Sequence, residues 1–294
     1  MFINFIKMKE AKLYKKEKKL KNAVRCLACS HKCLIKKGKT GLCGVRKNID
    51  GKLYLLVYGR VAAEHIDPIE KKPLYHFLPG SFAYSIGCVG CNFKCDWCQN
   101  FDISQISKER IIFGEERTPE QIVKEALLNK CETIAYTYNE PVIWIEFVYD
   151  VARLAKEKGL KNVYVTNGYW SKESFDFLNK EKLIDAMNID LKCFDEKIHL
   201  KYCGGKLKNV LETIKKVVKS KIHVEITTLL IPGINDDEIQ LKNIAKFIFS
   251  LDKKGEIPWH VSRFFPRYKF ADGKHFITPI ESLKKAYEIG KKKV

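Results

Sequence analysis

The residues best suited to chemistry are Cys91, Cys95 and Cys98, which form a C-x3-C-x2-C array within eight residues. They directly follow the apolar residues 82–86, a pattern typical of a buried strand. A tetrahedral zinc ion or a fully ligated iron–sulfur cluster takes four protein ligands. Three thiolates on one loop can instead hold a 4Fe–4S cubane and leave its fourth iron open to an outside ligand. The alternative is a zinc site that Cys88 or another residue completes.

A second set of cysteines lies nearer the N-terminus. Cys26, Cys29, Cys33 and Cys43 form a C-x2-C-x3-C-x9-C array, with glycines where the backbone would wrap around a metal. Four thiolates suit either tetrahedral zinc or a second iron–sulfur cluster. We favour the cluster, because a redox enzyme has a use for one, but the spacing leaves zinc open.

Composition bounds the class of protein. The 294 residues are 46% hydrophobic and 30% charged, which suits one large domain or a domain with an appendage. No apolar run reaches the roughly 18–20 residues that span a bilayer, and Lys7 and Lys9 interrupt the apolar start, unlike a signal peptide. Eleven cysteines without such a signal predict metal ligation in a reducing cytoplasm, not a disulfide scaffold and not a membrane protein.

The chain is strongly basic, with a net charge of +19, which makes RNA a candidate partner. Part of the excess lies in residues 1–22 and in the lysines at 291–293, where solvated tails account for it. Lysine greatly outnumbers arginine, the residue that usually makes bidentate contacts with phosphate. Charge alone therefore does not establish a nucleic-acid site.

From residue 81 onward, apolar strands alternate with amphipathic helices. Thr118 and Pro119 suit the N-cap and first position of the first helix. Six such units predict an α/β fold, a partial (β/α)6 TIM-like barrel with its chemistry at the carboxyl ends of the strands. The expected strands are 82–86, 133–136, 162–166, 186–190, 223–229 and 259–264, and the expected helices are 120–128, 142–158, 172–178, 207–219, 238–251 and 281–290.

The first 80 residues form a separate N-terminal part, which gives domains of 1–80 and 81–294. We expect a basic, amphipathic helix over residues 1–22, then the cysteine-rich knuckle and a strand over residues 52–58. Residues 60–80, which contain three prolines, are expected to be irregular and to wrap over the barrel.

The three-cysteine loop, with Trp97 before its last cysteine, resembles the signature of the radical SAM superfamily. Within that superfamily, the chain resembles the pyruvate formate-lyase-activating enzymes. The segments that carry this resemblance are residues 188–192, His199, 231–236 and 259–266. The N-terminal cysteines and the stretches 57–61 and 139–141 are further similar to the AmmeMemoRadiSam radical SAM subgroup, named for co-occurring Memo-like and AMMECR-like proteins. The resemblance implies a 4Fe–4S cluster, S-adenosylmethionine (SAM), an external one-electron reductant and possible association with those two proteins.

Polar residues that follow the strands have roles that this resemblance implies. Asn139 and Glu140 would bind the ammonium of SAM, since a carboxylate and an amide oxygen accept hydrogen bonds from an ammonium. Asp190 and Lys192 alone could equally form a buried structural ion pair. The resemblance places Asn167, Asp190 and Lys192 at the ribose hydroxyls and methionine carboxylate, and Trp97, Ile231 and Pro232 at the adenine.

The predicted activity is reductive cleavage of SAM to methionine and a 5′-deoxyadenosyl radical, which takes hydrogen from a protein or a small metabolite. His260 and Arg263, near the last strand, are candidates to contact that substrate. One alternative is a radical SAM enzyme that modifies RNA. The other is a zinc-binding nucleic-acid or scaffold protein without redox chemistry.

Overall fold

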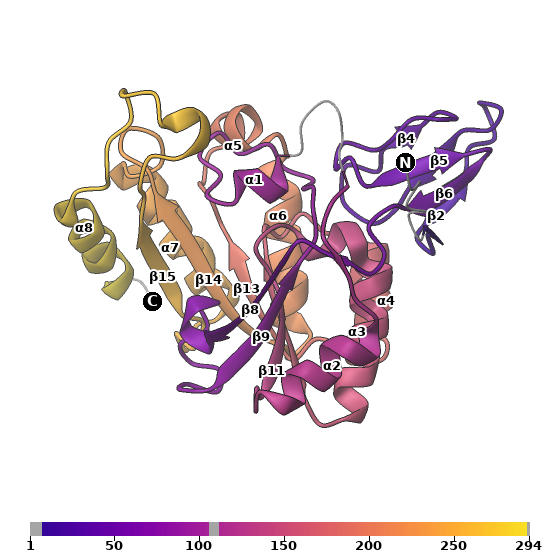
Figure 1. Ribbon diagram of the computed structural model, residues 1–294. Helices are drawn as coiled ribbons and strands as arrows, with labels where there is room; N and C mark the ends of the chain where they lie inside the picture. Colours follow the sequence, from indigo (N-terminus) through magenta and orange to yellow (C-terminus); the bar gives the residue numbers. More distant parts are fainter. Residues whose placement is uncertain (1–7, 106–111, 293–294) are drawn as a thin grey trace.

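The computed structural model describes residues 8–105 and 112–292, and a curled seven-stranded sheet forms its centre (Figure 1). All neighbouring strands are parallel except the edge strand β8, which runs antiparallel to β9. The predicted partial barrel is therefore confirmed, with one additional strand. The sheet order is β15 (Trp259–Arg263), β14 (His223–Leu230), β13 (Ala186–Asp190), β12 (Lys161–Thr166), β11 (Thr133–Tyr136), β9 (Phe82–Gly87) and β8 (Ala63–Pro68).

Helices follow the parallel strands and pack against the sheet, as the alternating pattern predicts. The helix over residues 119–128 begins at a capping box, in which Thr118 and Gln121 exchange hydrogen bonds and Pro119 occupies the first helical position. Short helices occur at α1 (Phe101–Ser104), η1 (Ile69–Lys71), η2 (Pro141–Trp144) and η3 (Tyr268–Phe270). The longer helices are α2 (Pro119–Leu128), α3 (Ile145–Glu157), α4 (Lys172–Asn179), α5 (Glu196–Cys203), α6 (Leu207–Lys219), α7 (Glu238–Leu251) and α8 (Ile280–Lys291).

The N-terminal part is built from short antiparallel strands, which lie above α3 and α4 in Figure 1. The helix expected over residues 1–22 is wrong for the described residues 8–22, and residues 1–7 lie outside the described chain. Pairing with distant strands stabilises the extended form there: Lys9 pairs with Leu55, and Tyr14 pairs with Cys26. The strands are β1 (Lys9–Glu10), β2 (Tyr14–Lys16), β3 (Val24–Cys26), β4 (Leu34–Ile35), β5 (Arg46–Ile49) and β6 (Lys52–Leu55).

The segment expected to be irregular, residues 60–80, is regular in its first half. It forms β7 (Arg60–Val61), which pairs with β10 (Glu115–Glu116), and then β8. Because Pro68 pairs with Phe82 at the start of β9, residues 69–81 lie at the amino ends of the strands. This stretch, which we call the base segment, closes the end of the barrel opposite the cysteine loop. None of the helices in the described ranges has the length and apolar character needed to cross a membrane.

Candidate active site

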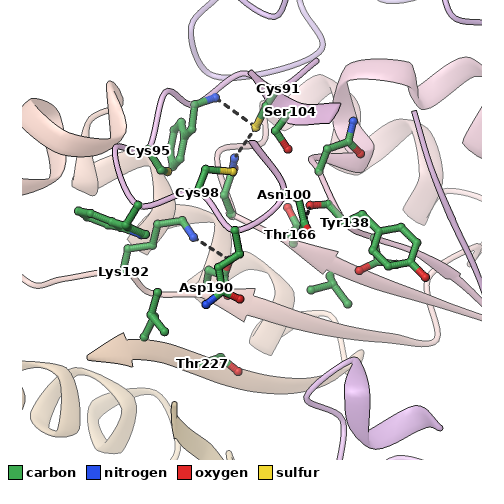
Figure 2. Close-up of a pocket in the computed structure, with 18 of the residues that line it drawn as sticks. Cys91, Cys95, Cys98, Asn100, Ser104, Tyr138, Thr166, Asp190, Lys192 and Thr227 are labelled. Carbon is green, nitrogen blue, oxygen red and sulfur yellow. Dashed lines mark hydrogen bonds and ion pairs between the residues drawn. The ribbon is translucent and has the colours of Figure 1, made fainter. Parts of the chain in front are cut away.

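The three-cysteine loop leaves the sheet directly after β9, at the carboxyl edge of the parallel strands. Cys91, Cys95 and Cys98 line one wall of a cavity of about 320 Å³, and Figure 2 shows them around the same space as Asp190 and Lys192. The backbone N–H of Phe93 donates to Cys91 Sγ at 3.4 Å, which orients that sulfur. Among the described residues that line the cavity there is no fourth cysteine and no histidine. The loop can therefore offer three thiolates to one cluster.

The electrostatic surroundings of the three thiols differ. Burial raises the pKa of Cys91, and the nearby Glu140 carboxylate adds to that rise. Burial also raises the pKa of Cys98. The pKa of Cys95 is lowered, because a hydrogen bond from Cys203 and the positive charge of Lys192 outweigh its burial. A thiol ligates a metal as the thiolate, which the neighbours of Cys95 favour.

Asp190 and Lys192 form an ion pair across the cavity from the loop, with Lys192 Nζ at 2.8 Å from Asp190 Oδ2 (Figure 2). Burial lowers the pKa of Lys192, but the negative charges of Asp190 and of the Cys95 thiolate raise it more, so the net pKa lies above the ordinary value. The ammonium therefore stays charged beside the cysteines. This ion pair thus presents an ammonium and a carboxylate to a bound zwitterion.

Asn167 and Trp97 also line the cavity, and both are held by neighbours. Asn167 Nδ2 donates to Asn92 Oδ1 at 2.8 Å, which ties the end of β12 to the cysteine loop. The Trp97 ring packs against Tyr202 and Phe270. These contacts fix both side chains in the cavity lining.

Asn139 is among the residues that line the cavity, and its side-chain oxygen has no hydrogen-bond partner within the described chain. Its amide nitrogen donates to the carbonyls of Cys88 and Gly90, at 2.7 and 2.8 Å, and these two acceptors fix the orientation of the amide. The Oδ1 atom is buried without a hydrogen-bond donor. Leaving a buried acceptor unsatisfied costs about 1–3 kcal/mol, so this atom is suited to a ligand that donates a hydrogen bond.

Glu140 lies behind the cavity wall and does not line it. Its carboxylate accepts hydrogen bonds from the Thr166 hydroxyl at 2.8 and 2.9 Å, the Asn167 N–H at 2.8 Å and the Trp170 indole at 3.1 Å. The sequence pattern could not show that Glu140 points away from the cavity, because a residue at a strand end can face either side of the wall. The geometry gives the Glu140 side chain a positioning role, since Thr166 and Asn167 do line the cavity.

Four other predicted residues are not brought to the cavity. Ile231 is buried beside it, with its N–H bonded to Asn235 Oδ1 at 2.6 Å, and the neighbouring Pro232 is likewise absent from the lining. Arg263 Nε donates to the Thr278 carbonyl at 2.8 Å, away from the cavity. His260 faces Glu225 nearer the base.

Sequence reasoning missed several lining residues. Thr227 and Leu229 point inward from β14, and the alternation of that strand could have identified them. Lys71, Lys72 and Pro73 come from the base segment, and nothing in their local pattern places them under a barrel. Lys72 is buried, and its ammonium lies 2.7 Å from Asp67.

Glu140 should make stability depend on pH. Burial raises its pKa to about 7, above the ordinary value of 4.5, although four hydrogen-bond donors oppose the rise. A carboxyl group whose pKa is higher in the folded chain than in the unfolded chain stabilises the fold while it is protonated. This contribution is present in full below about pH 4.5 and is lost as the pH rises through 7. The quantity to compare is the free energy of unfolding of the wild type minus that of Glu140→Gln. We expect this difference to fall by about 2–3 kcal/mol between pH 5 and 8.

Urea unfolding of the two proteins at intervals of one pH unit checks this expectation. Glu157→Gln on the exposed side of α3 is the matched control and should follow the wild type throughout. Parallel stability curves for the wild type and Glu140→Gln would contradict the expectation.

The four N-terminal cysteines converge on a second, smaller site. Cys26, Cys29, Cys33 and Cys43 are all free thiols and line one space together with Arg46. Burial raises the pKa of each thiol, and Arg46 partly offsets the rise at Cys26 and Cys43.

This second site lies against the three-cysteine loop. The backbone at Gly90 packs closely against Cys43, and a Cβ atom at position 90 would lie 2.5 Å from the Cys43 carbonyl oxygen. Glycine, which has no Cβ, allows this close approach. A ring nitrogen of His31 lies 2.9 Å from the Asn92 carbonyl, next to Cys91.

The half-barrel presents three cysteines beside an ion pair at its carboxyl edge. These features define a class of enzyme in which an iron–sulfur cluster keeps one iron free for a ligand from outside the protein. Residues 85–243, more than half of the chain, match the model of the radical SAM superfamily. The chain belongs to that superfamily, and the family implies a 4Fe–4S cluster and SAM.

Curated relatives agree with this membership. The chain is 45% identical over 280 residues to an uncharacterized protein of Methanocaldococcus jannaschii, covering 95% of this chain and 80% of that protein. It is 32% identical over 202 residues to a putative glycyl-radical enzyme activating enzyme of the same organism, covering 67% and 77%. It is 28% identical over 192 residues to the pyruvate formate-lyase-activating enzyme of Staphylococcus epidermidis, covering 60% and 74%. The predicted likeness to activating enzymes is confirmed.

Among solved structures, a radical SAM methyltransferase from Sphaerobacter thermophilus has a TM-score of 0.56 at 12% identity. The match covers 97% of this chain and 74% of that one. At this identity the likeness concerns the fold alone.

Proposed function

We propose that this radical SAM enzyme holds its 4Fe–4S cluster on Cys91, Cys95 and Cys98. With an electron from an external reductant, the loaded site would cleave SAM to methionine and a 5′-deoxyadenosyl radical, which takes a hydrogen atom from the substrate. The observation that carries the proposal is the cavity wall, where three thiols converge without a fourth cysteine or a histidine among the described lining residues.

The cavity supplies matching groups for SAM. The unpartnered Asn139 Oδ1 would accept a hydrogen bond from the ammonium, and Lys192 would bind the carboxylate. Asp190 and Asn167 are the groups for the ribose hydroxyls, and Trp97 is the apolar surface near the adenine. Glu140 would hold Thr166 and Asn167 in place without touching SAM. Leu229 replaces Ile231 and Pro232 as the apolar residue that β14 offers to the cavity.

We further propose a protein substrate and membership of the AmmeMemoRadiSam subgroup. Two relatives are named as activating enzymes, whose printed names describe action on another enzyme. The N-terminal cysteines and the stretches 57–61 and 139–141 support the subgroup. Memo-like and AMMECR-like proteins are then the candidate partners. Membership of the superfamily favours this redox chemistry over a zinc scaffold, and no contact in the described chain favours RNA.

For the second site we propose an iron–sulfur cluster on Cys26, Cys29, Cys33 and Cys43. The four thiols line one space, which is the donor set that either group needs. We favour the cluster because a redox enzyme has a use for a second one.

The source of the hydrogen atom tests the substrate class. The anaerobically reconstituted enzyme, with SAM and dithionite, is mixed with extract from cells grown in deuterated medium, separated into protein, RNA and small-molecule fractions. We expect mass spectrometry to find deuterium in 5′-deoxyadenosine with the protein fraction, since the radical keeps the atom it removes. Deuterium transfer only from the RNA or small-molecule fraction would contradict a protein substrate, and absence of 5′-deoxyadenosine would contradict the activity itself.

A further inference from the structure

Three histidines from distant parts of the chain surround the carboxylate of Glu225, near the amino end of β14. His260 Nε2 lies 2.5 Å and His76 Nδ1 lies 3.3 Å from the same oxygen, Oε2. His223 Nε2 lies 2.9 Å from the other oxygen, Oε1. The backbone N–H groups of Tyr75 and His76 also donate to this carboxylate. Glu225 itself is completely buried, so the whole arrangement is built around one fixed anion.

The cluster lies on the same inner face of the barrel as the cavity, one step nearer the base. Thr227 is two residues after Glu225, Ser262 is two residues after His260, and both line the cavity. The base segment contributes His76, and it is tied to the sheet nearby, where Asn188 Nδ2 donates to the Pro73 carbonyl at 2.8 Å. The His76 side chain is 60% exposed, so an ion from solvent can reach the cluster.

We propose that His76, Glu225 and His260 bind a divalent transition-metal ion of the zinc type. Their ligand atoms, Nδ1, Oε2 and Nε2, all lie within 4.8 Å of one another. Two imidazole nitrogens and one carboxylate oxygen are a frequent donor set for zinc, and they leave a fourth position for water or a substrate oxygen. The proposal is independent of the cysteine sites and of the radical chemistry.

The surroundings of the carboxylate match those of a metal ligand. Ligating carboxylates are themselves hydrogen-bonded, which fixes their orientation. Here His223 and the His76 N–H hold Oε1, so that Oε2 faces the other two imidazoles. A bound ion would join the base segment to β14 and β15 and close the barrel end. Its open position would lie on the inner face that leads to the cavity.

Zinc binding to the full-length chain tests the proposal, after anaerobic reconstitution with iron and sulfide so that the cysteines are occupied. We expect one zinc per chain after equilibration with buffered Zn²⁺. The zinc X-ray absorption spectrum should show a nitrogen and oxygen shell at about 2.0–2.1 Å without sulfur at about 2.3 Å. Iron, sulfide and circular dichroism confirm that each variant is folded and loaded.

Three variants should form a graded series. Loss of a hydrogen-bond partner of a metal ligand typically costs roughly 10–100-fold in affinity, which is the effect expected of His223→Asn. His76→Asn removes a ligand and should weaken binding further, and its exposed position spares the fold. His65→Asn, an exposed histidine on β8, should change nothing. A sulfur shell around the zinc, or zinc binding that His76→Asn leaves unchanged, would overturn the proposal.

Discussion

Replacement of Cys95 by alanine should lower the production of 5′-deoxyadenosine by at least about three orders of magnitude, because the cofactor carries the chemistry and loses one of three ligands. If the second site holds the iron–sulfur cluster proposed above, the iron content should fall at the same time from about eight to about four atoms per chain, since that cluster does not depend on Cys95. Anaerobic reconstitution with iron, sulfide, SAM and dithionite, followed by chromatography of the nucleoside, measures the first effect. Iron and sulfide analysis measures the second.

Two other cysteine variants provide matched controls. Cys29→Ser removes a ligand of the second site, so it should also lose about four irons. Unlike Cys95→Ala, it should keep the change in the electron paramagnetic resonance spectrum that SAM causes at the remaining cluster. Cys131→Ala, in the turn after α2, should keep all its iron and activity. Cleavage of SAM by Cys95→Ala would show that a different residue holds the cluster.

The sequence was sufficient to predict the barrel, because each of its strands is short, apolar and followed by an amphipathic helix. The predicted strand over residues 133–136 and the helices over residues 207–219 and 238–251 have the same bounds in the structure. The edge strand β8 was missed, because it carries the polar residues Glu64, His65 and Asp67 and its pairing with β9 is not a local property. Residues 8–22 were misjudged for the same reason, since their partners lie elsewhere in the chain.

The convergence of Cys91, Cys95 and Cys98 on one cavity wall was predictable, because residues closely spaced on one loop stay near one another. The other site residues depend on which way a side chain turns at the end of a strand, and spacing does not determine that. Glu140 and Asn139 are neighbours, yet one faces Trp170 behind the wall and the other faces the cavity. The cluster around Glu225 joins residues about 150 positions apart, so no sequence motif could represent it.

Arg46 is buried between the second cysteine site and the barrel, where it joins the two parts of the molecule. Its side chain is 2% exposed, and it contacts Glu146 through two nitrogens, at 3.1 and 2.5 Å. Its Nε donates to the Ile143 carbonyl at 2.8 Å. Glu146 has one further partner, the Lys12 N–H at 3.0 Å. Removal of the guanidinium would therefore leave a buried carboxylate with one backbone donor.

We expect Arg46→Met to lower the free energy of unfolding by about 3–5 kcal/mol, the cost of leaving one charge of a buried pair uncompensated. The double variant Arg46→Met/Glu146→Leu should recover most of that loss, because apolar side chains of similar volume often replace a buried ion pair without net cost. Urea unfolding followed by tryptophan fluorescence measures both effects. An Arg46→Met protein as stable as the wild type would contradict the assigned role of the ion pair.

The same pair of variants separates structural support from electrostatic influence on the second site. Arg46 lies close enough to Cys26 and Cys43 for its charge to lower the pKa of both thiols. A nearby cation stabilises the more negative, reduced form of a cluster, so its loss should lower the reduction potential there. Glu146 raises the pKa of Cys26, so the double variant removes an opposing negative charge together with the cation. We expect it to regain stability while the potential of the proposed N-terminal cluster, measured by redox titration, returns only part of the way to the wild-type value. A potential that Arg46→Met leaves unchanged would show that Arg46 acts only by holding the two parts of the molecule in contact.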